Sequence, residues 1–78
     1  MNAVRIEWLD HCSAPENEWQ SLDDVKNLEP ELVTSYGFVV RETDDFITIA
    51  ASRGQGNESF LGDLCIVKSC IVNRKNIK

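Results

Sequence analysis

The sequence has little of what usually reveals a function: three cysteines, one histidine, two prolines and four glycines in 78 residues. No apolar run approaches the roughly 20 residues needed to span a bilayer. The segment Met1–Glu7 has neither the basic region nor the apolar region of a secretory signal. Because this length supports one small core, we expect a single domain over residues 1–78 that makes no membrane contact and works in the cytoplasm.

The cysteines show no sign of a disulfide framework or a metal site. An odd number would leave one thiol unpaired, so reduced, buried thiols are the simplest interpretation. A zinc site would have to combine His11, Cys12, Cys65 and Cys70. The spacing Cys65-x4-Cys70 differs from the usual two-residue zinc spacing, and cysteine in an apolar run commonly packs as a small hydrophobe. We predict no metal and no cofactor.

Catalytic motifs are equally scarce. His11 and Cys12 are neighbours in the sequence, whereas a Cys–His nucleophile pair usually comes from distant parts of a chain. The pair Asp44–Asp45 suits a turn, and the pair Asp23–Asp24 suits the first turn of a helix. The segment Gly54-x-Gly56 lacks the rest of a phosphate-binding loop. The sequence therefore predicts no catalytic residue and a protein that is not an enzyme.

The charge is negative overall and unevenly distributed. The formal net charge of −5 argues against a general nucleic-acid binder, because phosphate binding relies on many Lys and Arg side chains. Residues 1–45 contain three basic and eleven acidic side chains, a net of −8, and residues 46–78 contain five basic and two acidic ones, a net of +3. Such asymmetry indicates an acidic surface that faces either a partner or solvent.

Alternating apolar residues predict a β-rich fold. Along Val4–Trp8 the apolar side chains occupy every second position, which is the period of a half-buried strand. A one-turn kink at Lys68–Ser69 separates the last two apolar runs. We predict a mainly β, five-stranded SH3-like barrel with one short helix inserted after the first strand, and an open α+β sheet as the alternative. The predicted strand centres are Val4, Val33–Glu42, Phe46–Ser52, Leu64–Val67 and Cys70–Arg74.

The segment Tyr36–Ser52 reads as a β-hairpin whose turn is Glu42–Asp45. Gly37 interrupts its first strand, which predicts a bulge or a close approach of two backbones. We expect Tyr36, Phe38 and Val40 to share one face, and Ile47, Ile49 and Ala51 to line the buried face of the return strand. Residues 53–59 should form a flexible tip, and Gly62–Asp63 a second turn.

A short helix is predicted between a polar loop over residues 10–18 and Pro30. Ser21 is a good N-cap, and Asp24 lies at the capping-box position. Leu22, Val25 and Leu28 form one apolar stripe at three-residue spacing. Two helical turns are marginal in isolation, so packing against the remainder of the fold should hold this helix.

Aromatic and arginine side chains give the best indication of a binding surface. Trp19 precedes the helix, Tyr36 enters the hairpin, and Arg41 and Arg53 lie at strand ends. Small barrels often bind peptides or nucleotides on surfaces of this composition. We predict binding residues Trp19, Tyr36, Arg41 and Arg53, while Trp8 is expected to cover one end of the barrel.

An ordered set of short motifs covers most of the chain and resembles a family of small, uncharacterised bacteriophage proteins. The family pattern often has a proline before the last strand, where Val67 stands here, and the tail after Asn73 is more basic. The resemblance implies the small barrel and a phage origin, but no functional residue. The matching motifs are Trp8-x-Asp10-x-Cys12, Trp19-x-Ser-Leu-Asp-Asp-Val25, Tyr36-Gly-Phe-Val-Val40, Asp45-Phe-Ile-Thr-Ile-Ala-Ala-Ser52, Gly62–Asp63 and Ile66-x-Lys-x-Cys-Ile71.

Three functions are compatible with these observations. The leading hypothesis is a non-enzymatic phage accessory protein in the host cytoplasm that binds a host protein and inhibits a defence or regulatory component. The first alternative is a homo-oligomer that sequesters a nucleotide or nucleotide signal through the four binding residues. The second is a barrel that binds single-stranded nucleic acid through the basic C-terminal portion, which the overall acidity disfavours.

Overall fold

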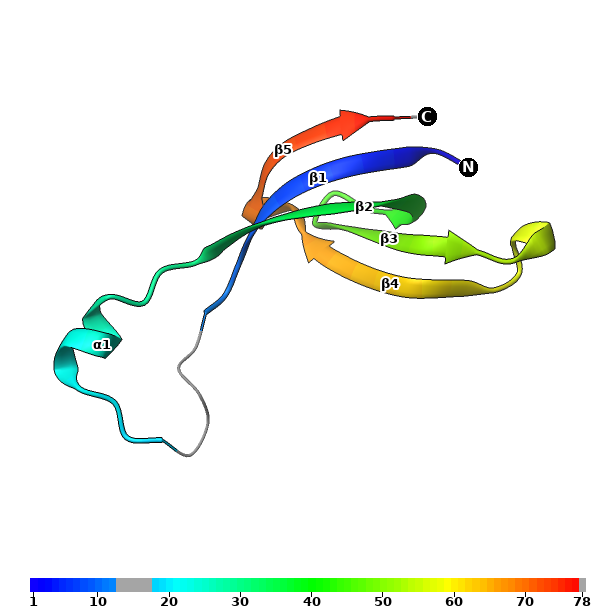
Figure 1. Ribbon diagram of the computed structural model, residues 1–78. Coiled ribbons are helices and arrows are strands. Elements are labelled where there is room, and N and C mark those ends of the chain that lie inside the picture. Colours follow the sequence, from blue (N-terminus) through cyan, green and yellow to red (C-terminus); the bar gives the residue numbers. More distant parts are fainter. Residues whose placement is uncertain (13–17, 78) are drawn as a thin grey trace.

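Five antiparallel strands and one short helix form the structure, a computed structural model that describes residues 1–12 and 18–77 (Figure 1). The strands form one sheet in the order β4-β3-β2-β1-β5. The mainly β class, the five strands and the helix inserted after the first strand are thus confirmed. The elements in chain order are β1 (Ala3–Asp10), α1 (Leu22–Lys26), β2 (Glu31–Glu42), β3 (Phe46–Arg53), η1 (Gln55–Asn57), β4 (Phe60–Val67), η2 (Lys68–Cys70) and β5 (Ile71–Asn76).

The sheet is open, in agreement with the alternative rather than with a closed barrel. β4 and β5 are its two edges, and the single 3-10 turn η2 connects them where the sequence predicted a one-turn kink. At this turn the Lys68 N–H donates a hydrogen bond to the Asp45 carbonyl at 2.8 Å. The start of the last strand is therefore fixed against the β2–β3 turn, although the two edge strands are not paired.

The core lies on one face of the sheet, here called the core face. β1 follows the predicted alternation: Val4 and Ile6 are fully buried, and Trp8 packs against them with its indole N–H on Ser35 Oγ at 3.0 Å. The buried apolar residues among those described are Val4, Ile6, Ile47, Ile49, Ala50 and Ile66. This core is small for 78 residues, because much of the chain lies outside the sheet.

The predicted hairpin is present, but its faces differ from the prediction in two places. The β2–β3 register shifts between Val39 and Arg41, so Val40 is an extra residue and does not continue the face of Tyr36 and Phe38. On β3 the alternation also fails, since Ala50 is buried and Ala51 is exposed. The prediction of a buried Ala51 was wrong.

The end of the β3–β4 hairpin also differs from the sequence-based prediction. Gly62–Asp63 is not a second turn, because β4 begins at Phe60 and its pairing with β3 continues without a shift on both sides of Gly62. Gly62 has φ 70°, and a Cβ there would lie 3.0 Å from the Cβ of Ala51. A glycine is therefore needed inside the strand rather than at its end.

Helix α1 is capped as predicted and yet is exposed to solvent along its length. Ser21 Oγ accepts the Asp24 N–H at 3.1 Å, and the Asp24 carboxylate accepts the Ser21 N–H at 3.4 Å, which completes a capping box. The helix ends at Lys26, after five residues, and none of them is buried. The expectation that packing within the chain holds this helix was wrong.

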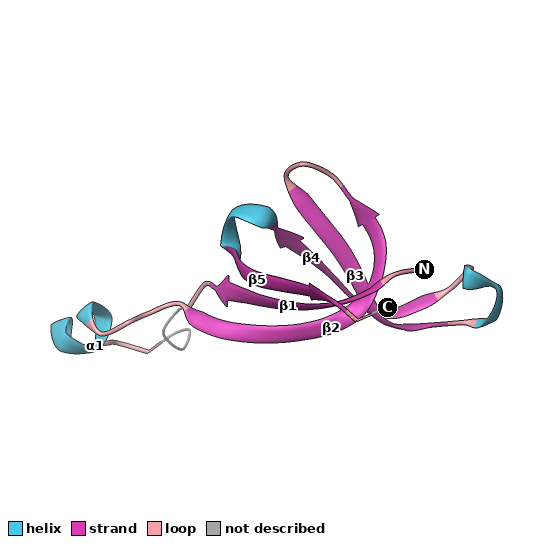
Figure 2. Ribbon diagram, turned by 90° about the horizontal axis from the view of Figure 1, so that it is seen from above, coloured by secondary structure: helices cyan, strands magenta, loops and turns pink. Residues whose placement is uncertain are grey.

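The helix belongs to an arm, defined here as residues 18–30, which projects from the ends of β1 and β2 (Figures 1 and 2). The chain measures 51 × 24 × 19 Å, with a radius of gyration of 15.8 Å. A compact chain of this length would have a radius of gyration of about 11.5 Å. The polar loop predicted at residues 10–18 leads into this arm, and its residues 13–17 lie outside those described.

Candidate functional site

The face of the sheet opposite the core, here called the outer face, brings together three of the four predicted binding residues. Tyr36 and Phe38 are neighbours on this face of β2, because side chains two apart in a strand point the same way. Tyr36 is 58% exposed. It lies opposite Arg5 of β1, whose guanidinium is paired with Glu7 at 2.9 Å.

Arg53 and Arg41 each lie over an aromatic ring of the hairpin. The Arg53 guanidinium carbon is 4.6 Å from the centroid of Phe38, and that of Arg41 is 5.2 Å from the centroid of Phe46. Neither arginine takes part in an ion pair with a described residue. Stacking holds the two cations in place by cation–π attraction, and their N–H groups stay available for an external carboxylate or phosphate.

A shallow hollow of about 290 Å³ adjoins Arg53 at the end of the β3–β4 hairpin. Its lining combines two serines and a glycine with an aromatic and an aliphatic side chain. The hollow could accept a group held by the arginine. The lining residues are Ser52, Arg53, Gly54, Ser59, Phe60 and Leu61.

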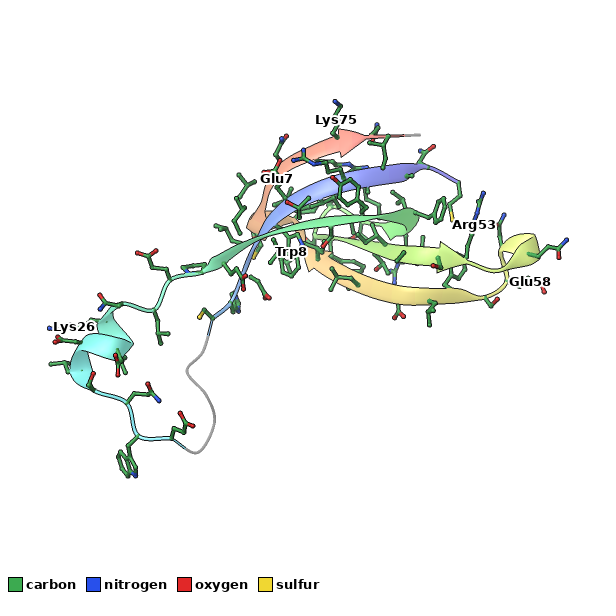
Figure 3. All side chains as sticks on the ribbon, in the orientation of Figure 1. Glu7, Trp8, Lys26, Arg53, Glu58 and Lys75 are labelled. Atoms are coloured by element: carbon green, nitrogen blue, oxygen red, sulfur yellow. The ribbon has the colours of Figure 1, made fainter. Side chains whose placement is uncertain are left out.

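Trp19 does not join this surface. It lies on the arm and is fully exposed at 102%. In Figure 3, Lys26 of the arm and Arg53 of the hairpin lie at opposite ends of the molecule. The sequence placed Trp19, Tyr36, Arg41 and Arg53 in one site, whereas the structure divides them between the outer face and the arm.

A second hollow, of about 140 Å³, collects the candidate metal ligands His11, Cys65 and Cys70. It lies between the end of β1 and the β4–η2 connection. Among the described residues, no three His, Cys, Asp or Glu side chains come close enough together to hold a metal ion. The hollow gives no geometry for a metal site.

The thiols are less buried than the sequence predicted. Cys12 and Cys65 are exposed, and only Cys70 is partly buried. Cys65 pairs with Thr48 and so lies on the outer face, while its neighbour Ile66 faces the core. The prediction of buried thiols was wrong for Cys12 and Cys65, because an apolar run of a two-faced strand also contains outward positions.

Each acidic pair lies where the sequence placed it, one in the first turn of the helix and the other in the hairpin turn. Asp24 completes the helix cap. In the β2–β3 turn, Thr43 Oγ1 accepts the N–H groups of Asp45 and Phe46, each at 3.2 Å. These turn and cap roles are those that the sequence suggested for the two pairs.

Glu42 forms a three-residue ion cluster that the sequence did not reveal. Its carboxylate accepts two hydrogen bonds from Arg74 of β5, at 2.6 and 3.0 Å, and pairs with Lys68 of η2 at 2.8 Å. The hydrogen bonds from Arg74 and Lys68 lower the pKa of Glu42 from 4.5 to about 2. The cluster joins the β2–β3 turn to the last strand, and these partners lie too far apart in sequence for any pattern to indicate it.

Protonation of Glu42 should weaken the protein at low pH. A carboxyl whose pKa is lowered on folding stabilises the fold above its unfolded pKa of 4.5, and this contribution is lost as the pH falls towards about 2. Denaturant unfolding of the wild type and of Glu42→Gln should therefore differ most above pH 4.5 and converge near pH 2. Glu58→Gln, at a residue in no ion pair with described residues, is the control and should follow the wild type throughout. A Glu42→Gln difference that stays constant with pH would contradict the ion cluster.

Comparison with known proteins identifies no relative: no family model, no curated protein and no solved structure matches this chain. Within the described part of the chain, no helix is long and apolar enough to cross a membrane. The outer face carries Tyr36 and two stacked pairs, Arg53 on Phe38 and Arg41 on Phe46. It is identified as a candidate binding surface on its geometry alone.

Proposed function

We propose that this protein is a non-enzymatic binding module that contacts an acidic surface of another protein through the outer face. The observation that supports it is the pair of arginines stacked on Phe38 and Phe46 with no carboxylate partner among the described residues. Arginine and exposed tyrosine are the residues that most often dominate the binding energy of protein interfaces. Their positions on a paired hairpin limit the entropy lost on binding.

The resemblance to bacteriophage proteins suggests where the partner comes from. In that setting the partner is a host protein in the host cytoplasm, and binding inhibits a defence or regulatory component. An accessory protein of this size can act by occupying a surface, which requires no catalytic group. This setting, like the resemblance itself, is part of the proposal.

Charge reversal at Arg53 provides the test of this surface. Arg53→Glu should raise the dissociation constant for a partner captured from host lysate by about thirtyfold or more, because a buried arginine anchor typically contributes about 2 kcal/mol. The Arg53 side chain is exposed and forms no ion pair with a described residue, so the far-ultraviolet circular dichroism spectrum should not change. Titration of the purified partner by calorimetry measures the effect.

Lys26→Glu is the matched control, because it changes the net charge by the same amount on the remote arm (Figure 3). It should leave the dissociation constant within about threefold of the wild type. Equal weakening by the two variants would indicate attraction by net charge alone and would contradict a specific outer-face contact.

A nucleotide is the second candidate for the same face. The hollow beside Arg53 and the exposed ring of Tyr36 provide a cation, two hydroxyl groups and a stacking surface. A ligand present at 100 times its dissociation constant stabilises a protein by about 2.7 kcal/mol. Nucleotide screening by thermal shift separates the two candidates, since a host protein partner predicts no shift with any nucleotide.

Nucleic acid is the weakest of the three functions considered for this chain. Of the C-terminal basic residues, Lys68 and Arg74 both pair with Glu42, which reduces the positive charge that phosphates could meet. Binding to a phosphate backbone draws on several free cations at once. We therefore do not extend the proposal to single-stranded DNA or RNA.

A further inference from the structure

Four apolar side chains of the arm are exposed to solvent. Trp19, Leu22, Val25 and Leu28 are exposed at 102%, 68%, 51% and 41%. The whole chain exposes 6102 Å², whereas a compact monomer of 8.8 kDa would expose about 4,800 Å². The excess of about 1,300 Å² per chain, polar and apolar together, reflects the elongated shape that the arm gives the chain.

The arm lies beyond the last strand pair and extends away from its own sheet (Figure 1). The β1–β2 ladder continues to the pair Asp10–Glu31, and the arm joins the sheet directly at Glu31. Figure 1 shows the arm directed away from β5 and from the tip of the β3–β4 hairpin. In this arrangement the sheet leaves the apolar side chains of the arm exposed, so a second molecule can cover them.

We infer that this second molecule is another copy of the same chain, and that the arm of each copy docks along β5 of the other. The arm is acidic, with four acidic residues and one basic residue between positions 18 and 30. β5 and η2 together, residues 68–76, contain three basic residues and no acidic one. Even with the carboxylate of Glu42 included, this edge is positive, and Lys75 is exposed on it.

The β5 edge also offers what the apolar residues of the arm require. Val72 and Ile77 are exposed at 59% and 42%. Among the described strands β5 pairs with β1 alone and forms an edge of the sheet, an arrangement that proteins usually cover. The docked arm would bury these apolar side chains and shield the strand edge from solvent.

Two other arrangements of two copies fit the charges less well. Arm-to-arm packing would bring together two segments that each have a net charge of −3. The opposite edge, β4, contains Asp63 and no basic residue, so it would repel the arm. Of these three surfaces, only the β5 edge combines opposite charge with exposed apolar side chains.

The available area suits a stable dimer. Reciprocal docking around a two-fold axis makes the contact twice, and the excess surface of two chains amounts to about 2,600 Å². Permanent homodimer interfaces typically bury about 2,000 Å² or more in total. The dimer uses the arm and β5, and so leaves the outer-face residues Arg41 and Arg53 for a separate partner.

Sedimentation velocity over a range of protein concentrations tests this arrangement. The wild type should form a dimer. The arm variant Leu22→Ser with Val25→Ser and the β5 variant Val72→Ser with Lys75→Glu should each raise the dimer dissociation constant by about thirtyfold or more. Leu61→Ser, which removes an exposed leucine from β4, is the control and should leave it unchanged. Circular dichroism verifies that every variant is folded.

A mixing experiment identifies which surfaces meet. The arm variant retains a functional β5 edge and the β5 variant retains a functional arm, so an equal mixture should form a heterodimer through one intact contact. Arm-to-arm packing predicts instead that the β5 variant dimerises normally, and that result would overturn the inference. A wild type that stays monomeric at every concentration would overturn it as well. Lys75→Glu alone, an exposed single change, repeats the test if Val72→Ser affects folding.

Discussion

Ile47→Ala should lower the free energy of unfolding by about 3 kcal/mol and the Tm by roughly 12 to 24 °C. Ile47 is fully buried at the centre of the core face, opposite Ile66 of β4 and Glu42 of β2. Removing its side chain leaves a cavity that the paired β3 backbone cannot move to fill. Because a domain of 78 residues has a stability of roughly 4 to 12 kcal/mol, this loss is a large part of the total.

Leu61→Ala provides the matched control for this prediction. Leu61 is also an aliphatic strand residue, but it is 74% exposed, so its truncation should change the stability by no more than about 0.5 kcal/mol. Urea unfolding at one fixed protein concentration compares the variants, because self-association would make the apparent stability depend on concentration. Equal destabilisation by the two substitutions would contradict the assignment of Ile47 to the core.

The strand pattern was predictable because burial on one face leaves a period of two in the sequence. Val4, Ile6 and Trp8 show this period, and their places on the core face follow from it. The position of the helix cap was equally predictable, since the capping box depends only on Ser21 and Asp24, three residues apart. Features that depend on neighbours in the chain were thus predicted correctly.

Features that depend on strand pairing could not be obtained in this way. The bulge at Val40 and the buried Ala50 arise from how β2 and β3 meet, and no local pattern marks either of them. An apolar stripe on a short helix is likewise typical of packing, but it does not say which molecule the stripe packs against. The prediction of a helix held within its own chain failed for α1 for this reason.

The candidate site was predicted in part for the same reason. Tyr36 and Phe38 share a face by strand alternation, so the sequence contained that neighbourhood. The stacking of Arg53 on Phe38 depends on the register of two strands, and Trp19 is separated from both by the arm. The ion cluster of Glu42 with Lys68 and Arg74 joins residues far apart in sequence, which only the folded sheet brings together.

Gly37→Ala should destabilise the protein by about 1 to 3 kcal/mol, although it adds only one methyl group. A Cβ at Gly37 would lie 2.9 Å from the carbonyl oxygen of Ala50 and 3.1 Å from the Cβ of Ile49. Both obstacles belong to the paired β3 strand, so neither can rotate away as a flexible side chain could. Relief requires β2 and β3 to separate at the point where the hairpin supports Phe38 and Arg53 on the outer face.

Gly56→Asn, in η1 at the end of the β3–β4 hairpin, separates this steric effect from the general effect of replacing a glycine. Gly56 has φ 84°, and a Cβ there would meet nothing within 4 Å. Asparagine adopts left-handed backbone angles more readily than other residues with a side chain, so its effect should stay within about 0.5 kcal/mol. Denaturant unfolding measures both variants, and amide hydrogen exchange along β2 and β3 should increase only in Gly37→Ala. An alanine at position 37 that leaves stability and exchange unchanged would mean that the two strands do not approach as closely as the structure shows.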